Sequence, residues 1–483
     1  MTYPEKILNF INGEVTGGSN TGGIPKYNPH DASLLGEIYN SNENDVSRAM
    51  TVAQDAFLSW SQLTPVKRGQ HLADVVTMIK NRRQELEEIV ALETGKPIQD
   101  ATGEVGAAIL QGEFFAGEGM RLYARSLTSG MPGKQSHTVR QPLGVAVLIV
   151  PANTPIANIA WKVFPALICG NSVVLKASED APYTALYFAL LCKEAGIPNG
   201  VVNVIQGSGE SAGMPLVIHN KTAVISFTGS TAVGKWIGEQ AGKRLTKVSL
   251  ELGGKNPFIV CDDADLDNAV KWASLSAFSN AGQRCASGSR IIVHERIYDA
   301  FLSAFVNKAN SLTLGVSKGS DLGPVINERA FQTILGAIER CRAEGAKIEC
   351  GGERGTAPET AKGYYVRPTI ISGVDPKSEV SRKELFGPVA CIYKVDSLDT
   401  AIAIANDSEY GLTSAIHTKD VNKALRFARS IRAGVANINF GTFGSEPHMP
   451  FGGFGWSGNG TREPGTEALD VYSELKNISF LEI

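Results

Sequence analysis

The chain of 483 residues, with 43% hydrophobic and 20% charged residues, is too long for one ordinary domain and too apolar to be disordered. Its 46 lysine and arginine residues are balanced by 49 aspartate and glutamate residues, so no basic excess favours a nucleic-acid partner. Seven scattered cysteines, no CxxC pair, no basic leader and no long apolar run predict a cytoplasmic protein without disulfides, metal or membrane span.

The elements predicted along the chain alternate between strands and helices. The first 40 residues are rich in turns, a helical spacing of apolar residues begins at Asn44, and Thr64-Pro65 predicts a second capped helix. From Leu143, short β-branched runs alternate with helix-compatible segments, and a second such series begins near Pro257. The runs are residues 144–150, 172–176, 201–205, 223–227, 291–295, 390–395 and 414–418. This alternation predicts βαβ units with parallel sheets, in two α/β domains.

Two short motifs match enzyme signatures by letter but not by context. Residues 209–213 fit the G-x-S-x-G pattern of a hydrolase nucleophile elbow, with Ser211 as nucleophile, but the β-branched run before it already ends at Ile205. Gly207 and Gly209 begin a dinucleotide fingerprint, yet Thr228-Gly229 stands where the acidic residue belongs. Both matches are therefore weak.

Asp263, Asp265 and Asp267 alternate as in a calcium loop, but Asn268 and Ser274 replace the required glycine and glutamate. We expect aspartates that cap a helix there instead. Residues 227–231, FTGST, directly follow an apolar run, and Gly234 is predicted to open the helix after it. Free N–H groups at a helix start bind anions, although a tight turn without a ligand is the alternative.

Cys285 and Glu251 are the candidate nucleophile and general base. Most cysteines are inert packing residues, and a thiol that reacts needs a base or an electropositive site. No histidine lies within eight residues of Cys285, but Glu251 stands between an apolar run and a glycine pair, which suits a general base. Taken singly, each residue is ambiguous.

Taken together, the motifs closely resemble those of the NAD(P)-dependent aldehyde dehydrogenase superfamily. ELGGKNP at 251–257 and GQRC at 282–285 follow each other as in that family, with Cys285 34 positions after Glu251. Five further segments match the family in order: residues 151–155, GNSVVLKASE ending at Glu179, FTGST at 227–231, residues 384–388 and residues 450–453. The resemblance spans roughly residues 10 to 480.

The resemblance implies a mechanism. The Cys285 thiolate would attack the aldehyde, and the Asn153 amide and the Cys285 N–H would stabilise the oxyanion. Hydride would pass to the nicotinamide, and Glu251 would activate the water that hydrolyses the thioester. Lys162 and Glu463 match positions thought to relay protons from Glu251.

The resemblance also assigns a cofactor site. Lys176 and Glu179 would hold the adenosine ribose, Ser230 the pyrophosphate, and Glu384 and Phe386 the nicotinamide ribose. The predicted set also contains Ser178, Gly229 and Leu252. Because a carboxylate such as Glu179 accepts a hydrogen bond from a free 2′-hydroxyl and repels a 2′-phosphate, NAD is expected. Lys176 could offset that repulsion, so NADP stays possible.

The substrate is predicted from departures from the family pattern. Ala152 and Thr154 replace larger family residues beside Asn153. Trp161 and Ser279 stand where succinate-semialdehyde enzymes carry arginines, which argues against succinate semialdehyde as the substrate. Ser279 with Phe451 disfavours an aromatic box for a quaternary ammonium. Arg284 is either an anion contact or a structural ion pair. The predicted substrate-site residues are Trp161, Arg284, Phe443 and Phe451, and the polar loop 443–448 favours a polar or hydroxylated aldehyde.

The expected architecture is an α/β, aldehyde dehydrogenase-like fold. It comprises a Rossmann-type NAD(P)-binding domain (1–120 and 142–252), a catalytic α/β domain (253–456) and a small β oligomerisation element (121–141 and 457–483). An exposed strand in that element invites pairing, so a homodimer or homotetramer is expected. Two alternatives stay open: a CoA-acylating aldehyde dehydrogenase, which Glu251 disfavours, and a serine hydrolase that uses Ser211.

Overall fold

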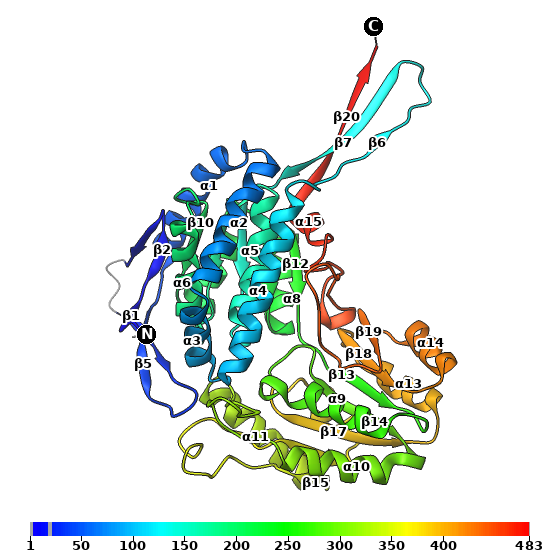
Figure 1. Cartoon of the computed structure of the whole chain (residues 1–483). Coiled ribbons are helices and arrows are strands. Elements are labelled where there is room, and N and C mark those ends of the chain that lie inside the picture. Colours follow the sequence, from blue (N-terminus) through cyan, green and yellow to red (C-terminus); the bar gives the residue numbers. More distant parts are fainter. Residues whose placement is uncertain (1–2, 18–21, 483) are drawn as a thin grey trace.

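The structure, a computed structural model, describes residues 3–17 and 22–482. Within these residues the strands form four sheets, two of seven strands and two of three. Each seven-stranded sheet lies between layers of helices and forms the centre of one lobe (Figure 1). A narrow ribbon of strands, which we call the arm, projects away from both lobes (Figure 1). The predicted α/β fold class is confirmed.

The sheet of the first lobe has the strand order β12-β11-β8-β9-β10-β2-β3. Strands β8 to β12 pair in parallel, and β2 and β3 add an antiparallel edge. The bounds are β2 Asn9–Ile11, β3 Glu14–Thr16, β8 Val145–Ile149, β9 Ser172–Lys176, β10 Val202–Ile205, β11 Thr222–Thr228 and β12 Lys247–Glu251. The first four β-branched runs in the sequence therefore form central strands, as predicted.

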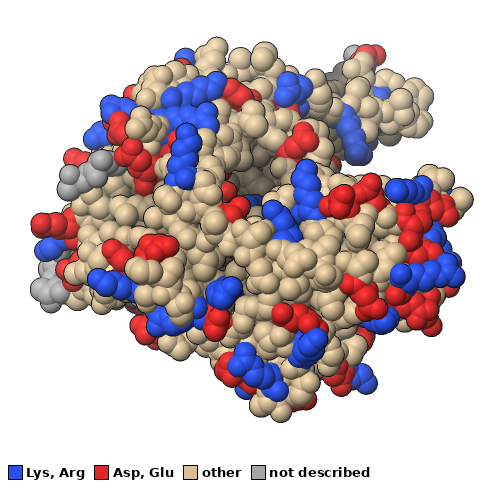
Figure 2. Space-filling model, turned by 60° about the horizontal axis from the view of Figure 1, so that its bottom comes forward, with Lys and Arg blue, Asp and Glu red and all other residues tan. Residues whose placement is uncertain are grey.

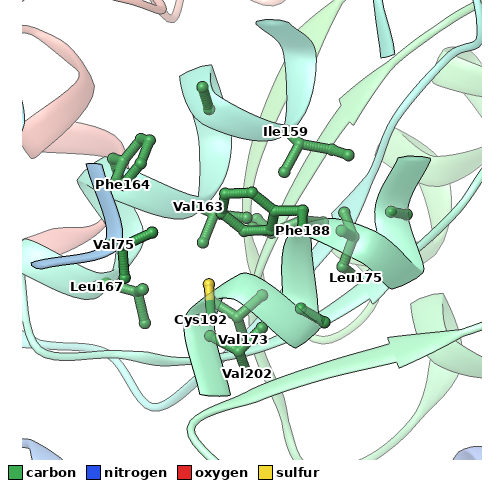
Figure 3. Close-up of a cluster of buried hydrophobic side chains, with 14 of the residues drawn as sticks. Val75, Ile159, Val163, Phe164, Leu167, Val173, Leu175, Phe188, Cys192 and Val202 are labelled. Atoms are coloured by element: carbon green, nitrogen blue, oxygen red, sulfur yellow. The ribbon is translucent and has the colours of Figure 1, made fainter. Parts of the chain in front are cut away.

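Helices cover both faces of this sheet. Helices α1, α7 and α8 pack on one face, and α2 to α6 on the other. The bounds are α1 Glu43–Trp60, α2 Pro65–Asn81, α3 Arg83–Thr94, α4 Ile98–Glu118, α5 Pro155–Ile168, α6 Pro182–Glu194, α7 Met214–Ile218 and α8 Thr231–Gly242. In Figure 3, Phe164 and Leu167 of α5, Val173 of β9 and Phe188 of α6 lie in one fully apolar cluster. This packing holds α5, which carries Lys162, rigidly against the sheet.

The sheet of the second lobe has the order β15-β16-β17-β14-β13-β18-β19 and is parallel except for β15. Its strands are β13 Asn256–Val260, β14 Gly288–His294, β15 Lys347–Cys350, β16 Thr369–Ser372, β17 Val389–Val395, β18 Thr413–His417 and β19 Val435–Ile438. Helices α9 and α10 cover one face, and α11, α13 and α14 the other. The helices are α9 Leu266–Phe278, α10 Glu295–Asn310, α11 Glu328–Ala343, α12 Glu379–Arg382, α13 Leu398–Asn406 and α14 Val421–Ser430.

The arm is an antiparallel sheet of order β20-β7-β6, with β6 Ser126–Leu127, β7 Lys134–Pro142 and β20 Ser473–Leu481. A third, small sheet of order β1-β5-β4 contains β1 Lys6–Ile7, β4 Gly23–Tyr27 and β5 Leu34–Tyr39. Between β12 and the arm, residues 452–472, including the short helix α15 Ala468–Val471, return along the first lobe. The domain boundaries predicted above stay a prediction.

Local signals place most helix starts correctly. Thr64 accepts a hydrogen bond from the N–H of Lys67 at the start of α2, and Asp265 caps α9 as expected for the aspartate cluster. The start expected at Gly234 is wrong by three residues, because the Ser230 hydroxyl accepts from the N–H of Val233 and α8 begins at Thr231. None of the helices in the described residues combines the length and the apolar run that a bilayer crossing needs.

Candidate active site

A strained turn presents Cys285 between the two lobes. Asn280 and Ala281, before it, both adopt left-handed backbone conformations, with φ of 55° and 53°, and Gly282 follows with φ of 68°. A Cβ atom on Gly282 would lie 2.1 Å from the carbonyl oxygen of Gly387, so only glycine fits there. Each non-glycine residue held in this conformation costs about 1–3 kcal/mol, a cost typical of functional turns.

Asn256, the first residue of β13, fixes the carbonyl of Cys285. Its Nδ2 donates to the carbonyl oxygens of Cys285 and Ser287 at 2.7 and 2.9 Å, and its Oδ1 accepts from the N–H of Thr413 at 3.0 Å. This amide clamps the nucleophile's loop to the second sheet. Within the described residues, the backbone N–H of Cys285 donates no hydrogen bond. It therefore remains available to a ligand.

The Cys285 thiol is protonated at neutral pH in this state. Burial, then the charges of Glu384 and Glu251, raise the pKa of Cys285 to about 12, while the Ala286 N–H and the Arg284 guanidinium act in the opposite direction. The other cysteines of the chain are also free thiols. Cys285 is singled out by its partial exposure beside a buried carboxylate and a cation.

Glu251 ends β12, and the residue is 4% exposed, with both carboxylate oxygens buried. Neither carboxylate oxygen has a hydrogen-bond partner in the part of the chain that the structure describes. Burial raises the pKa of Glu251 well above its ordinary value, the charge of Glu463 adds to that, and Lys162 and Arg462 oppose it. A buried, unpaired carboxyl group with a raised pKa is costly to keep and suits proton transfer.

Lys162 and Glu463 form a buried ion pair beside Glu251. The Lys162 ammonium lies 2.7 Å from a carboxylate oxygen of Glu463, and both side chains are essentially inaccessible. Lys162 also donates to the hydroxyl of Ser226 at 2.6 Å, and that hydroxyl donates to Glu463 at 3.0 Å. The sequence placed Lys162 and Glu463 near the base, but Ser226, a polar residue within the apolar strand β11, was missed.

Asn153 lies just before α5 and reaches toward the loop of Cys285. Its Nδ2 donates to the carbonyl of Gln283 at 2.9 Å, which uses one of its two N–H groups, while its Oδ1 is buried without a partner among the described residues. The Asn153 backbone carbonyl accepts from Lys96, whose ammonium also pairs with Glu104. Lys96 and Glu104 were not predicted from the sequence, because the segment around Asn153 that they contact lies about 50 residues away along the chain.

The residues predicted for the adenosine ribose lie at the carboxyl end of β9. Lys176 is buried, and its ammonium lies 3.0 Å from the Glu179 carboxylate, while Ser178 lies between them in the chain. The other Glu179 oxygen accepts from the N–H of Gly209 at 2.8 Å. The structure therefore brings Lys176 and Glu179 together. It fixes the Glu179 carboxylate at the carboxyl end of the parallel strands, where α/β folds of this kind bind nucleotides.

The remaining predicted cofactor residues line two further turns. Gly229 and Ser230 lie between β11 and α8, and Leu252 packs against Gly234 of that helix. Glu384 lies against the Gly253-Gly254 turn after β12, and Phe386, two residues further along, has a left-handed φ of 56°. The N–H of Gly254 donates to Glu384 at 2.9 Å, and a Cβ atom on Gly253 would lie 2.1 Å from the other carboxylate oxygen. Burial raises the pKa of Glu384 to about 7.

Aromatic side chains and one arginine surround the approach to Cys285. Trp161 and Phe451 meet edge to face with ring centroids 5.5 Å apart, and Phe443 packs in the same cluster as Cys285. The Arg284 guanidinium lies 5.0 Å from the ring centroid of Phe443. All four predicted substrate residues therefore gather beside the nucleophile. Figure 2 shows a hollow in one face of the molecule, with cationic and anionic side chains interspersed around it.

Comparisons with known proteins agree with this geometry. The model of the "Aldehyde dehydrogenase family" matches residues 15–478. The chain belongs to the aldehyde dehydrogenase family. It is 40% identical over 484 residues to "Alpha-ketoglutarate semialdehyde dehydrogenase" of Haloferax volcanii and 37% identical over 481 residues to "Alpha-ketoglutaric semialdehyde dehydrogenase" of Bacillus subtilis, covering 99% of both chains in each case.

Among solved structures, the NAD+ complex of an aldehyde dehydrogenase from Bacillus cereus matches with a TM-score of 0.96 and 35% identity, covering 99% of this chain and 97% of that one. The protein is an NAD(P)-dependent aldehyde dehydrogenase that oxidises an aldehyde. The fixed Glu179 and Glu384 carboxylates and the close-packed glycine turns fit a dinucleotide with two riboses.

In this aldehyde dehydrogenase, the residues of the hydrolase-like motif at 209–213 and of the calcium-loop-like aspartate cluster are held by structural hydrogen bonds. The Ser211 hydroxyl is held by Asn40 and Ser208, and no histidine contacts it in the described residues. Asp263 accepts hydrogen bonds from Thr418 and pairs with Lys423. Neither segment lies beside Cys285.

Proposed function

We propose that this enzyme oxidises its aldehyde through a Cys285 thioester that water hydrolyses with Glu251 as base. The observation that carries the proposal is the buried Glu251 carboxyl, which has a raised pKa and no hydrogen-bond partner in the described residues. The test is absorbance at 340 nm with NAD or NADP and a panel of uncharged, hydroxylated and carboxylated aldehydes, without CoA. Turnover that appears only when CoA is added would favour the acylating alternative.

The chain's own groups account for the nucleophilic step. The S–H bond of Cys285 breaks and its proton passes to solvent water, while the sulfur bonds to the carbonyl carbon and the π electrons of the C=O bond move to the oxygen, which gains the negative charge. The Ala286 N–H and the Arg284 guanidinium favour the thiolate form. The bound nicotinamide supplies the hydride acceptor. Glu251, with Lys162 and Glu463 behind it, then takes the proton of the water that attacks the thioester.

The oxyanion is held by two N–H groups: the side-chain amide N–H of Asn153 that does not bond Gln283, and the backbone N–H of Cys285. Asn153→Ala is expected to lower kcat by about 10²–10³, as for other oxyanion donors. The measurement is the single-turnover rate of NADH formation. The control is Asn327→Ala, which also removes a partly buried amide, because Asn327 caps helix α11 in the second lobe. An Asn153→Ala rate within threefold of the wild type contradicts this role.

NAD is the proposed cofactor. Glu179 is anchored on both oxygens, by Lys176 and by the N–H of Gly209, so it cannot swing away from a 2′-phosphate without losing both contacts. A fixed carboxylate at this place favours a ribose with a free 2′-hydroxyl. The Bacillus cereus relative was also solved with NAD+. Equal kcat/KM values with NAD and NADP in the assay above would contradict the preference.

The proposed substrate is a polar aldehyde that carries a carboxylate at its far end. Arg284 makes no ion pair or side-chain hydrogen bond within the described residues, and its buried Nε lacks a partner. Asp100 interacts with it only over a longer range, and burial lowers the pKa of Arg284. An unpaired guanidinium beside the nucleophile favours an anionic ligand. Two relatives whose names specify a semialdehyde of a dicarboxylic acid support the same class.

Arg284→Met is expected to raise KM for carboxylated aldehydes about tenfold to a hundredfold, because it removes a hydrogen bond to a charged group. Uncharged aldehydes of the same length should change less than threefold. The control is Arg296→Met, since Arg296 follows the opposite end of β14 and is largely exposed. Equal losses for charged and uncharged aldehydes would instead assign Arg284 a structural role.

A homo-oligomer is the proposed assembly. The arm is only one layer thick, and Leu475, Phe480 and Leu481 on β20 are each more than half exposed. Thin ribbons with exposed apolar side chains are stabilised by pairing with a second copy. We expect light scattering at micromolar concentration to give the mass of a dimer or tetramer; the monomer mass, 51.4 kDa, would refute this.

The proposed location is the cytoplasm. The mechanism requires Cys285 as a free thiol, and a reducing compartment keeps thiols free.

A further inference from the structure

Tyr472 is a fully buried tyrosine that the steps above do not use. It lies between α15 and β20, at the point where the chain leaves the first lobe and enters the arm. Its hydroxyl donates to Oε1 of Glu463 at 2.9 Å. A buried tyrosine hydroxyl needs a partner, but this partner is half of the ion pair behind the general base.

Every contact of the Glu463 carboxylate comes from a different element. Lys162 of α5 pairs with Oε2 at 2.7 Å, and Ser226 of β11 donates to Oε1 and Oε2 at 3.0 and 3.1 Å. Tyr472 is the remaining donor, and it contacts the oxygen that Lys162 does not. The other charged groups facing this cluster are Glu251 of β12 and Arg462. Hydrogen bonds of this kind stabilise the ionised carboxylate and fix its orientation.

The orientation of Glu463 matters because it acts on Glu251. The charge of Glu463 raises the pKa of Glu251, and the charge of Lys162 lowers it. A Glu463 carboxylate that rotates would change how readily Glu251 loses its proton. Tyr472 is therefore one step removed from the reacting water and acts through Glu463.

Side chains of the first lobe and of the arm hold Tyr472 and the next residue in place by hydrogen bonds. The Tyr472 carbonyl accepts from Asn171 Nδ2 at 2.8 Å. The carbonyl of the next residue, Ser473, accepts from Lys247 at 2.8 Å, and its hydroxyl accepts from Arg140 of β7 at 3.0 Å. The position of the phenol ring thus depends on where the first residues of the arm strand are seated.

We propose that Tyr472 is a positioning residue that holds the Glu463 carboxylate in place against Lys162 and near Glu251. The segment in which the chain enters arm strand β20 would thereby affect the rate of thioester hydrolysis. The proposal rests on the proposed function. It predicts that loss of the phenol hydroxyl slows deacylation and leaves acylation and cofactor binding unchanged.

The test is Tyr472→Phe, which removes one oxygen atom and retains the ring. We expect a steady-state kcat about tenfold lower, because a hydrogen bond to a charged group is lost. The amplitude of the NADH burst and KM for NAD should stay at wild-type values. The acidic limb of the kcat–pH profile should move to lower pH, since a less firmly held Glu463 raises the pKa of Glu251 less.

Tyr393→Phe is the matched control, since Tyr393 is buried in β17 and its hydroxyl contacts Ser381 at 2.7 Å. It should lose comparable thermal stability without any shift in the pH profile. In a Glu463→Gln background, Tyr472→Phe should have no further effect on kcat. Rates expressed per burst site count folded enzyme alone, so partial unfolding does not obscure the result.

Two results would overturn the proposal: a Tyr472→Phe pH profile and kcat that match the wild type, or an equal tenfold loss in the Glu463→Gln background. Failure of the proposed function has a different signature. If Cys285 forms no thioester, Cys285→Ala still oxidises the aldehyde at a rate close to that of the wild type.

Discussion

Replacing Cys285 by alanine should reduce aldehyde oxidation by at least about 10⁴-fold, because the covalent route is lost altogether. The left-handed residues 280–282 lead into the turn of Cys285, and Asn256 clamps the Cys285 carbonyl, so the position of this residue is set by the backbone and not by its side chain. Cys285→Ala should therefore fold and bind NAD as the wild type does. The measurement is NADH formation at saturating aldehyde, together with NAD binding by protein fluorescence.

The control for this prediction is Cys350→Ala. Cys350 is also partly exposed, lies in β15 at the edge of the second sheet, packs against the apolar core there, and its sulfur contacts the carbonyl of Pro368. Its loss should leave turnover within twofold. Residual oxidation above 1% of the wild type in Cys285→Ala would show that another group can act as nucleophile and would reopen the hydrolase alternative. Testing Ser211→Ala for ester hydrolysis would then decide between the two residues.

The sequence was informative where one strand or one motif carries the feature. The β-branched runs at 144–150 and 172–176 became central strands because buried parallel strands need continuous apolar residues. The ends of such strands then place Lys176 and Glu251 at the edge of their sheet. Cys285 and Glu251 could be paired only through the family resemblance, since no local spacing predicts that two lobes meet at that point.

Contacts across the fold could not be predicted from the sequence. Ser226 reads as one polar residue in an apolar run, and its partners Lys162 and Glu463 lie 64 and 237 residues away. Tyr472 precedes the arm strand and looks like part of it, yet its hydroxyl turns inward to Glu463. The left-handed conformation of Ala281 likewise has no local signature, because alanine rarely adopts it, whereas Gly282 after it is required by the close approach of the Gly387 carbonyl.

Glu251→Gln should separate the two halves of the reaction. Acylation should persist, since removing the Glu251 charge removes one contribution that raises the thiol pKa. Deacylation should slow by about 10²–10⁴, the usual contribution of a general base. Stopped-flow absorbance should show a burst of about one NADH per active site followed by a slow phase. A variant without any burst would mean that Glu251 also activates the thiol, against a role confined to hydrolysis.

The pH dependence of the wild type gives an independent check on the same carboxyl group. Only the ionised form of Glu251 accepts a proton from water, and burial together with the Glu463 charge raises its pKa. Deacylation should therefore fall as the pH drops through that raised pKa, well above the range in which an exposed glutamate titrates. In Glu251→Gln the slow phase should lose this acidic limb. Retention of the limb in the variant would assign it to another group, for which Glu384, with its pKa of about 7, is the first candidate.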